Sequence, residues 1–382
     1  FRSRLCLIQQ LIGKFSIFIV PDYINFHKAD NYGSVLLAYA ITKVLKTLGY
    51  EAKIINYQPQ KQLAMYSIPI TTGNGRIKII LEKICWLPYM KDLRKKVKRF
   101  DAFRKKYIPM TPYTNKAEDI NNVCGTFDIT MAAGDQIWNP RCNEFEWCYY
   151  LDFVKNGKKI AYAPSMGGTV RSNISDDTYN LIKGFVSSFD AISVRDSNVN
   201  LVLDDAYPVT LDPTMLLPAD EWKIVAGDKS LVGEDYVFYY DPFDLDDDIL
   251  HAKRFATEKL CKLITCNLYF IFKADKKAFD YRLDAGPEEF LNYVRFAKAC
   301  IGRSFHLAVF SILFEKELLI IGGMNDKRIR ELMLKMFKDV ESVLYSDGDD
   351  VRITKDAYNN IYHKNLSEER NLSIDFLKRA LN

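Results

Sequence analysis

The chain has 382 residues, enough for two hydrophobic cores, and its 48% apolar and 27% charged residues are those of an ordinary globular protein. A formal net charge of +4 is too small to argue for a nucleic-acid surface, and no motif for one is present. No apolar run reaches the roughly 18 residues that a membrane span needs.

Scattered cysteines and histidines exclude a local metal motif. The 8 cysteines form no CxxC pair, and the 4 histidines lie far from them in the sequence. Reduced, mostly structural thiols of a cytoplasmic protein are the expectation. Residues 1–22 contain only a mild apolar stretch at 15–20, shorter than the core of a signal peptide. We interpret this segment as an extra helix, a fragment boundary or upstream sequence and assign it no function.

The first clear unit begins at Tyr23. Residues 23–26 form a short apolar stretch typical of a strand, and a polar turn follows at 28–34. Apolar residues then recur at helical spacing until Gly49: Leu37, Ile41, Val44, Leu45 and Leu48. Residues 52–57 predict a second strand. Strand, helix and strand in this order predict a parallel sheet.

Residues 91–107 predict a basic amphipathic helix. Leu93, Val97, Phe100 and Tyr107 line one face, and lysines and arginines fill much of the rest. One interpretation is a solvated helix face. The other is a peripheral contact with anionic lipid heads at the inner face of a membrane, or with a diphosphate. The sequence leaves both open.

Four further strands each end in a polar turn. They cover residues 128–133, 159–163, 191–194 and 209–211. In open parallel sheets such turns lie at the carboxyl edge of the sheet, where ligands bind.

The apolar pattern breaks between residues 217 and 234 and then restarts. Strands are predicted at 236–240, 268–272, 299–302 and 318–321, with a helix from Pro287 and a last helix over 367–381. We therefore predict an α/β protein with two facing domains, residues 23–218 and 219–382. A ligand site is expected between them.

Two side chains stand out at predicted strand ends. His306 lies in the first turn of a helix, after Arg303 and Ser304, where free amide groups favour an anionic ligand. A histidine can exchange a proton there, or serve only as a structural residue at the helix start. Arg195 can grip a carboxylate or phosphate, or form a salt bridge to a neighbour such as Asp196.

Two polar turns are weaker candidates. Residues 31–34 (NYGS) open the first helix and resemble a phosphate-binding turn, although Asn31 and Ser34 are also ordinary helix caps. Residues 134–140 (GDQIWNP) surround Trp138 with polar groups. Such a loop suits a sugar, and the alternative is a structured turn with a buried tryptophan.

Together these segments resemble the polysaccharide pyruvyl transferase family. The matching stretches follow in order along nearly the whole chain: HKADNYGS (27–34), AGDQIWNP (133–140), YLDF (150–153) with IAYA (160–163), ISVRD (192–196), LDPT (211–214), GPEEF (286–290) and SFH (304–306).

The resemblance implies two Rossmann-like domains facing a cleft, similar to GT-B glycosyltransferases. It also implies transfer of the pyruvyl group of phosphoenolpyruvate to two hydroxyls of a sugar, which gives a cyclic ketal. The expected acceptor is a saccharide of a capsule, exopolysaccharide or cell-wall polymer, often on a lipid diphosphate. The family's histidine falls on His306 and its strand-end arginine on Arg195. No cofactor is needed, and no metal is required.

Further roles follow from this chemistry. We expect Arg303, Ser304, Asn31 and Ser34 to bind the donor. The acceptor hydroxyls are assigned to Asp135, Gln136 and Asn139. The chain departs from relatives in three places: Ser304 stands where some have arginine, Leu307 replaces a glycine, and Gly134 replaces a serine.

Two rival functions remain. A GT-B glycosyltransferase that uses a nucleotide sugar needs a carboxylate for the ribose, for which Glu288 or Glu289 would serve. A carbohydrate-binding module without turnover is favoured only by the shift of the arginine to Arg303.

Overall fold

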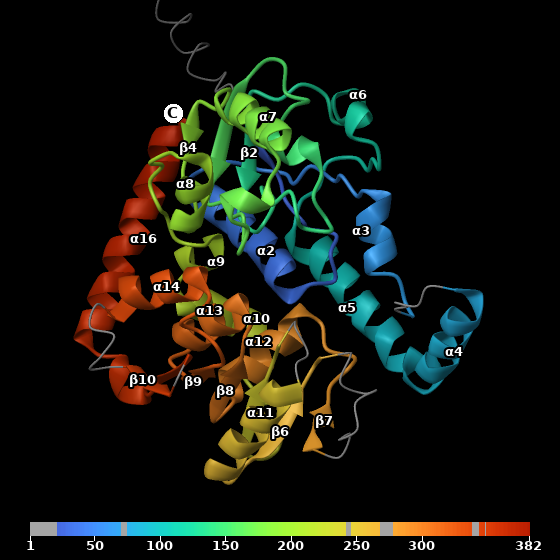
Figure 1. Cartoon of the computed structure of the whole chain (residues 1–382), viewed down its shortest axis with the longest axis vertical. Helices are drawn as coiled ribbons and strands as arrows, with labels where there is room; N and C mark the ends of the chain where they lie inside the picture. Colours follow the sequence, from blue (N-terminus) through green and yellow to red (C-terminus); the bar gives the residue numbers. More distant parts are fainter. Residues whose placement is uncertain (1–20, 70–74, 242–245, 268–277, 338–343, 348) are drawn as a thin grey trace, which may run out of the picture.

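The chain forms two α/β units stacked along its longest axis (Figure 1). The computed structural model describes residues 21–69, 75–241, 246–267, 278–337, 344–347 and 349–382. The blue and green unit contains a four-stranded sheet, and the yellow to red unit contains a seven-stranded sheet.

All four strands of the first sheet are parallel and follow chain order. They are β1 (Pro21–Ile24), β2 (Ile129–Ala133), β3 (Lys158–Tyr162) and β4 (Ala191–Ile192). Helix α2 (Tyr32–Thr47) follows β1, as predicted, and Leu36, Ile41 and Leu45 are fully buried on it. Because parallel strands end at one edge, the turns after β1 to β4 meet there.

Two predicted strands are wrong as regular elements. Residues 52–57 form only isolated bridges, from Ile54 to β1 and to Met110, and from Tyr57 to Thr114. The neighbouring segment contains Pro109 and Pro112, and proline cannot donate a ladder hydrogen bond. Residues 209–211 likewise contribute one bridge, between Val194 and Val209.

The second sheet has the order β10-β11-β9-β8-β5-β6-β7. Its strands are β5 (Tyr236–Tyr239), β6 (Lys262–Thr265), β7 (Asp280–Tyr281), β8 (Ala299–Gly302), β9 (Glu317–Ile320), β10 (Leu344–Asp347) and β11 (Asp350–Ile353). The five strands from β5 to β9 run parallel, whereas β11 pairs antiparallel with both β9 and β10.

The sequence predicted β5, β8 and β9 but missed β6, β7, β10 and β11. The strand predicted at 268–272 lies outside the described residues. The helix predicted from Pro287 is α12 (Pro287–Phe296), and the one after Ser304 is α13 (Phe305–Leu313). The last helix, α16 (Asn360–Leu381), begins seven residues before the predicted start.

Further helices surround the sheets. They are α3 (Gln60–Met65), α4 (Arg76–Trp86), α5 (Met90–Tyr107), α6 (Ile120–Cys124), α7 (Asp176–Val186), α8 (Ser197–Leu203), α9 (Pro213–Leu216), α10 (Ala219–Ala226), α11 (Asp246–Glu258) and α14 (Lys327–Phe337), with a short 3-10 turn, η1 (Leu87–Tyr89), between α4 and α5.

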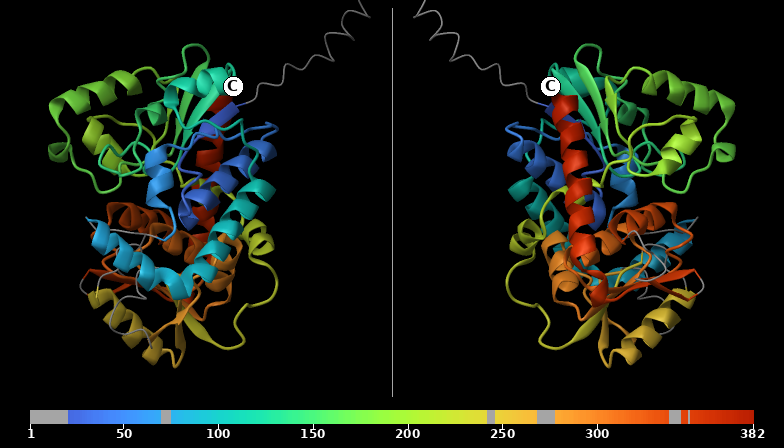
Figure 2. Two further views of the ribbon diagram at one scale, coloured as in Figure 1. Left: turned by 90° about the vertical axis from the view of Figure 1, so that its right-hand side faces the viewer. Right: turned by 90° about the vertical axis from the view of Figure 1, so that its left-hand side faces the viewer.

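The two units share a hydrophobic core. One continuous cluster joins Leu37 and Tyr162 of the first unit to Phe290 and Phe310 of the second. Helix α16 runs back along the first unit (Figure 2), where Ser373 Oγ accepts a hydrogen bond of 2.9 Å from Leu211 N. The predicted fold class, two facing Rossmann-like units, is confirmed, while the division at residue 218 stays a prediction.

Candidate functional site

A small cavity of about 200 Å³ lies where the two units meet. Its walls come from the turns after strands of both sheets and from the first turn of α13, and the lining residues are Asn31, Asp135, Gln136, Arg195, Tyr240, Arg303, Ser304, Phe305, His306 and Arg328. The structure thus brings together eight of the nine predicted site residues, either in the wall or directly behind it.

His306 projects from the start of α13 into the junction between the units. Ser304 caps this helix and accepts a hydrogen bond from Leu307 N. The imidazole packs on Gly33 of α2 so closely that a Cβ at residue 33 would lie 2.1 Å from Nδ1. Nε2 lies 3.8 Å from Asp212 Oδ2 and makes no hydrogen bond with the described chain. The ring is therefore fixed in place, and its Nε2 is buried without a hydrogen-bond partner among the described residues.

Arg195 is buried beside His306. Its Nη1 donates to Asp212 Oδ2 at 3.1 Å, so the salt bridge expected with Asp196 is formed with Asp212 instead. The guanidinium stacks 4.7 Å from the centre of the Phe305 ring. Its Nε and Nη2 are buried without a partner among the described residues. Buried donors without partners are costly, so these two groups point to an anionic ligand.

Asp212 connects the histidine and the arginine. It is fully buried at the start of α9, where Oδ1 accepts hydrogen bonds from the amide and hydroxyl of Thr214. Burial disfavours its charged form, but His306, Arg195 and Thr214 outweigh burial and hold the pKa of Asp212 below its usual value.

The protonation of His306 responds to the same contacts in the opposite direction. Burial lowers its pKa below the usual 6.5, and the carboxylates of Asp212 and Asp135 reduce that shift without reversing it. His306 is therefore neutral near pH 7 in the free protein. An anion bound in the cavity would favour the imidazolium.

Two more guanidiniums face the cavity. Arg303 is held by both carboxylate oxygens of Asp248, and Arg328 by both oxygens of Asp326. In each ion pair the arginine donates through Nε and Nη2, so its Nη1 does not take part in the pair. Because fork-shaped pairs fix the plane of a guanidinium, both cations are oriented before a ligand binds.

The first unit contributes the turns that open α2 and follow β2. Asn31 caps α2 by accepting hydrogen bonds from Gly33 N and Ser34 N, and it lines the cavity. Ser34 is buried behind the wall, where its hydroxyl donates to Asp135 Oδ2 at 2.7 Å. Asp135 has a φ of 58°, in the left-handed region that disfavours most side chains. Ser34 therefore positions Asp135.

In the loop after Asp135, only Gln136 reaches the cavity, whereas Trp138 and Asn139 are buried behind it. Gln136 lines the cavity, but Asn139 does not: its amide donates to Gln136 Oε1 at 3.1 Å and accepts from Thr169 at 2.7 Å. Trp138 is fully buried and stacks on Tyr150. Of the two interpretations left open for this loop, the ring of Trp138 fits the structured turn with a buried tryptophan, because it belongs to the core of the first unit.

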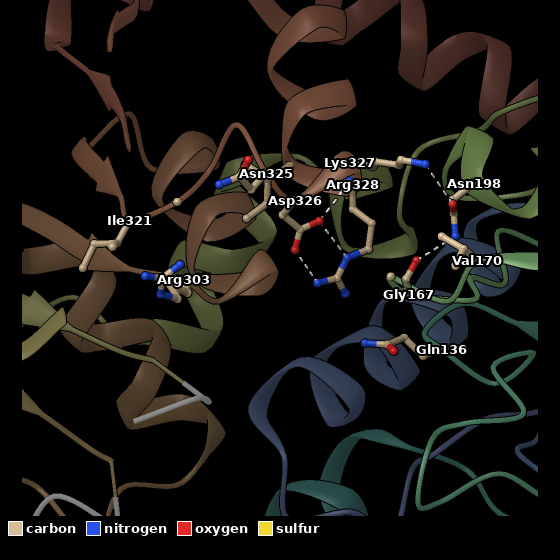
Figure 3. Close-up of a pocket in the computed structure, with 13 residues that line it drawn as sticks. Gln136, Gly167, Val170, Asn198, Arg303, Ile321, Asn325, Asp326, Lys327 and Arg328 are labelled. Atoms are coloured by element: carbon tan, nitrogen blue, oxygen red, sulfur yellow. Dashed lines mark hydrogen bonds and ion pairs between the residues drawn. The ribbon is translucent and has the colours of Figure 1, made fainter. Parts of the chain in front are cut away.

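A larger cavity of about 500 Å³ adjoins the first and shares Gln136, Arg303 and Arg328 with it (Figure 3). One side consists of Gln136, the backbone at Gly167 and Asn198 from the first unit. The other consists of residues around Asn325 to Arg328 at the start of α14. Lys327 Nζ reaches across and lies 3.4 Å from Asn198 Oδ1.

Sequence reasoning missed three residues of this site. Arg328 lies on α14, where only its place after β9 and Gly322 marks a strand-end turn. Asp212 and Gly33 lie inside motifs that carried the family resemblance, but neither had been given a role. Their contacts with His306 span 94 and 273 positions of sequence, so no local pattern reveals them.

The carboxylates proposed for a ribose are already engaged. Glu288 accepts from Lys106 Nζ and Tyr107 OH at 3.0 Å, and Glu289 pairs with Arg99 and caps α12 through Gly286 N. Both serve the contact between α5 and α12. The shift of an arginine to position 303 leaves the cation in the site, which weakens the case for a module without turnover.

Neither a metal cluster nor a membrane span is found in the described residues. No group of three or more His, Cys, Asp or Glu side chains there is placed to hold a metal ion. No helix in these ranges is both long and apolar enough to cross a bilayer. The seven cysteines that are described are free thiols.

The chain is similar to several solved structures. A putative UDP-N-acetylglucosamine 2-epimerase from Listeria monocytogenes is 11% identical with a TM-score of 0.50, over 94% of this chain and 90% of that one. The UDP-GlcNAc 2-epimerase from Neisseria meningitidis is 9% identical with a TM-score of 0.41, over 94% of this chain and 99% of that one. The E. coli heptosyltransferase WaaC with ADP is 11% identical with a TM-score of 0.36, over 78% of this chain and 85% of that one. The Listeria likeness shows a GT-B-like fold.

No curated protein sequence is significantly similar to the chain. The sequence profile described as polysaccharide pyruvyl transferase matches residues 31–323, which include the turn at Asn31, Arg195, His306 and the strand β9. This match covers most of the chain and every residue that lines the small cavity except Arg328. The chain belongs to the polysaccharide pyruvyl transferase family.

Proposed function

We propose that the protein transfers the pyruvyl group of phosphoenolpyruvate to two hydroxyls of a saccharide. The observation that carries this proposal is the small cavity at the junction, which Arg195 and His306 both line: Arg195 has two buried N–H groups, and His306 one buried nitrogen, without a hydrogen-bond partner among the described residues. Arg303 and Arg328 face the same space. A compact ligand with two anionic groups and a carbon to be protonated fits this set.

Size supports the assignment of the donor. The cavity of about 200 Å³ is below the roughly 300 Å³ at which sites for drug-sized ligands begin. In this proposal Arg195 holds the carboxylate or phosphate of the donor. Arg303 and the amides at the capped start of α13 bind the other anionic group, and Asn31 completes the wall.

His306 acts as the acid and then as the base. The anionic donor raises the pKa of His306, whose imidazolium then protonates the methylene carbon of phosphoenolpyruvate. C2 becomes electrophilic, and a sugar hydroxyl adds to it. Neutral His306 accepts the proton of that hydroxyl, which restores its charge.

The second half of the reaction closes the ketal. The bond between C2 and the phosphate oxygen breaks, and the second hydroxyl adds to C2. Of the two hydroxyl protons, one replaces the proton given to the methyl group and the other leaves with inorganic phosphate. Asp212 stays ionised and stabilises the imidazolium, while Arg303 or Arg328 balances the charge of the departing phosphate.

The larger cavity is proposed as the acceptor site. It adjoins the donor cavity at Gln136, and its volume of about 500 Å³ is within the range of sites for sugar-sized ligands. Asp135 and Gln136 would bind the reacting hydroxyls, with Asn139 and Ser34 as positioning residues behind them. The expected acceptor is a saccharide unit of a capsule, exopolysaccharide or cell-wall polymer.

Phosphate release separates this proposal from its rivals. The purified protein is incubated with phosphoenolpyruvate and a panel of synthetic and lipid-linked glycosides. Phosphate that appears only when donor and acceptor are both present, with a mass increase of the acceptor by one pyruvyl ketal, supports the proposal. Nucleotide release from a sugar nucleotide would instead identify a glycosyltransferase, and saturable binding of both substrates without turnover would identify a binding module.

A further inference from the structure

Helix α4 presents an apolar face to solvent. Ile80, Leu81, Ile84 and Leu87 are between 54% and 65% exposed, although three of them are spaced four and three residues apart along one side of the helix and the turn that follows it. Other strongly exposed aliphatic side chains include Leu201, Ile224 and Leu372, which lie on three different helices. A contiguous apolar face usually marks a binding surface, whereas isolated residues do not.

The opposite side of α4 is anchored. Trp86 is 2% exposed and forms a small cluster with Leu93 of α5 and Leu283 of the second unit. Viewed down the helix axis, Trp86 lies across from Ile80 and Ile84. The orientation of α4 is therefore set by a buried anchor, and the apolar face is directed away from the protein. Figures 1 and 2 show α4 and α5 on the side of the molecule away from α16.

The charges beside this face are mostly positive. Arg76 and Lys83 lie along its edge on α4 and are exposed. On α5, which follows directly, Lys91, Arg94 and Lys98 are exposed and form no described ion pair. The exposed acidic residues of α5 are Asp92 and Asp101, and Asp101 pairs with Lys28 and Arg104. By contrast, Lys95, Arg99 and Lys106 of α5 pair with carboxylates of the second unit.

We propose that α4 docks the protein on the surface of an anionic lipid bilayer. An apolar face with a basic edge is the pattern of a helix that lies in the plane of a membrane interface. The aliphatic side chains would enter the boundary between headgroups and acyl chains, and Arg76 and Lys83 would contact the anionic headgroups. This inference does not depend on pyruvyl transfer.

The test measures partitioning of the full chain onto vesicles. Phosphatidylcholine vesicles are compared with vesicles that also contain phosphatidylglycerol, by co-sedimentation. We expect binding to the anionic vesicles that weakens as salt is raised. The triple variant Ile80→Ser, Ile84→Ser and Leu87→Ser lowers the partition coefficient at least about 10-fold. The double variant Arg76→Gln and Lys83→Gln lowers it roughly 10-fold or more on anionic vesicles only.

A matched control removes aliphatic surface elsewhere. The triple variant Leu201→Ser, Ile224→Ser and Leu372→Ser replaces three side chains of at least equal exposure and is expected to bind vesicles like the unchanged protein. Equal sedimentation of the α4 variants and the unchanged protein would overturn the proposal. The absence of binding to any vesicles would also overturn it. If, in addition, the α4 triple variant converts a dimer to a monomer, the apolar face of α4 is an interface between two copies of the chain. If the α4 triple variant unfolds, the proposal is tested by vesicle binding of the double variant Arg76→Gln and Lys83→Gln alone.

Discussion

At the scale of residues, the site depends on one histidine placed among charges of both signs. His306 touches Gly33, faces Asp212 and lies beside Arg195, and these three residues come from three separate turns of the first unit. A neutral imidazole with a buried nitrogen that lacks a hydrogen-bond partner among the described residues is suited to take up a proton when an anion binds. Its local sequence does not distinguish this role from that of a structural helix residue.

Removing either candidate catalytic side chain tests the mechanism directly. His306→Ala removes the acid and base, and Arg195→Ala removes the cation with unpaired N–H groups. We expect each to lower the rate of phosphate release at least about 100-fold, the low end for an acid or base group. His363→Ala and Arg379→Ala on α16 are the controls, since they replace the same residue types outside the cavity. Near-normal turnover in either test variant would remove that residue from the mechanism.

Asp212→Asn tests the electrostatic coupling to His306. The carboxylate favours the imidazolium, so its loss should move the pKa of His306 further below 6.5. If the protonated form is active, the limb of kcat/KM that falls with rising pH shifts to lower pH by the same amount. The NMR titration of His306, assigned through His306→Ala, measures the pKa itself. An unchanged or higher midpoint contradicts the coupling, and Asp356→Asn controls for net charge.

Gly33→Ala tests the close approach of the two units. Gly33 needs no unusual backbone conformation, but a methyl group there would overlap the imidazole of His306. We expect about a 100-fold loss of turnover, the scale of effect of a misplaced catalytic group. The overpacked contact should also lower the free energy of unfolding, by about 1–3 kcal/mol, because Gly33 is buried in the first turn of α2. Gly184→Ala in α7, where a Cβ meets nothing within 4 Å, is the matched control.

At the scale of elements, α5 is a structural brace as well as a basic helix. Arg104 is 3% exposed and donates hydrogen bonds to the carbonyls of His27, Lys28 and Ala29 and to Asp30. These residues form the turn between β1 and α2 that leads to Asn31. Only part of the basic face predicted for residues 91–107 is therefore solvated.

Arg104→Ala should destabilise this turn severely. Four hydrogen-bond acceptors lose their donor, and breaking a buried ion pair typically costs about 3–5 kcal/mol. Urea unfolding followed by circular dichroism measures the change. Lys105→Ala, the exposed neighbour, is expected to cost less than about 0.5 kcal/mol. A loss of that small size for Arg104→Ala would show that the turn does not depend on the brace.

The sequence predicted the strands β2, β3, β5, β8 and β9 but missed β6 and β11 inside the second sheet and β7 and β10 at its edges. β2, β3, β5 and β8 are fully buried over most of their length, so their continuous apolar runs are visible. β7 has two residues and β10 pairs only with β11, and such short or peripheral strands have no clear apolar pattern. Residues 52–57 look like a strand but pair irregularly, because their neighbour contains two prolines.

At the scale of the whole molecule, the candidate donor site exists only because the units are packed together. Tyr32 OH donates to Ala285 O across the junction at 2.9 Å, and Glu331 of α14 accepts from the amide of Ser197 at 2.9 Å. Asn31 and Asp135 reach the cavity from one unit, and Arg303, His306 and Arg328 from the other. A bound donor would therefore stabilise the junction.

Phosphoenolpyruvate should raise the midpoint of thermal unfolding. At a concentration about 100 times its Kd, a ligand that binds only the folded state adds about 2.7 kcal/mol. Differential scanning fluorimetry across donor concentrations measures the effect. The Arg195→Ala variant should require a higher phosphoenolpyruvate concentration than the unchanged protein for the same shift of the midpoint. The His363→Ala variant should require the same concentration as the unchanged protein. If the ligand leaves the midpoint unmoved, the donor site is not in this cavity.

The sequence by itself determined the alternation of strands and helices that gives the fold class, the polar turns after several strands, and the placement of His306 at a helix start and of Arg195 at a strand end. These features follow from periodicity and from residue types close together in the chain. Only the tertiary structure decided which turns meet. It placed Asp212, Gly33 and Arg328 around His306, turned Trp138 and Asn139 inward, and left the apolar face of α4 in solvent. Those outcomes depend on how two packed units exclude water, which no local pattern records.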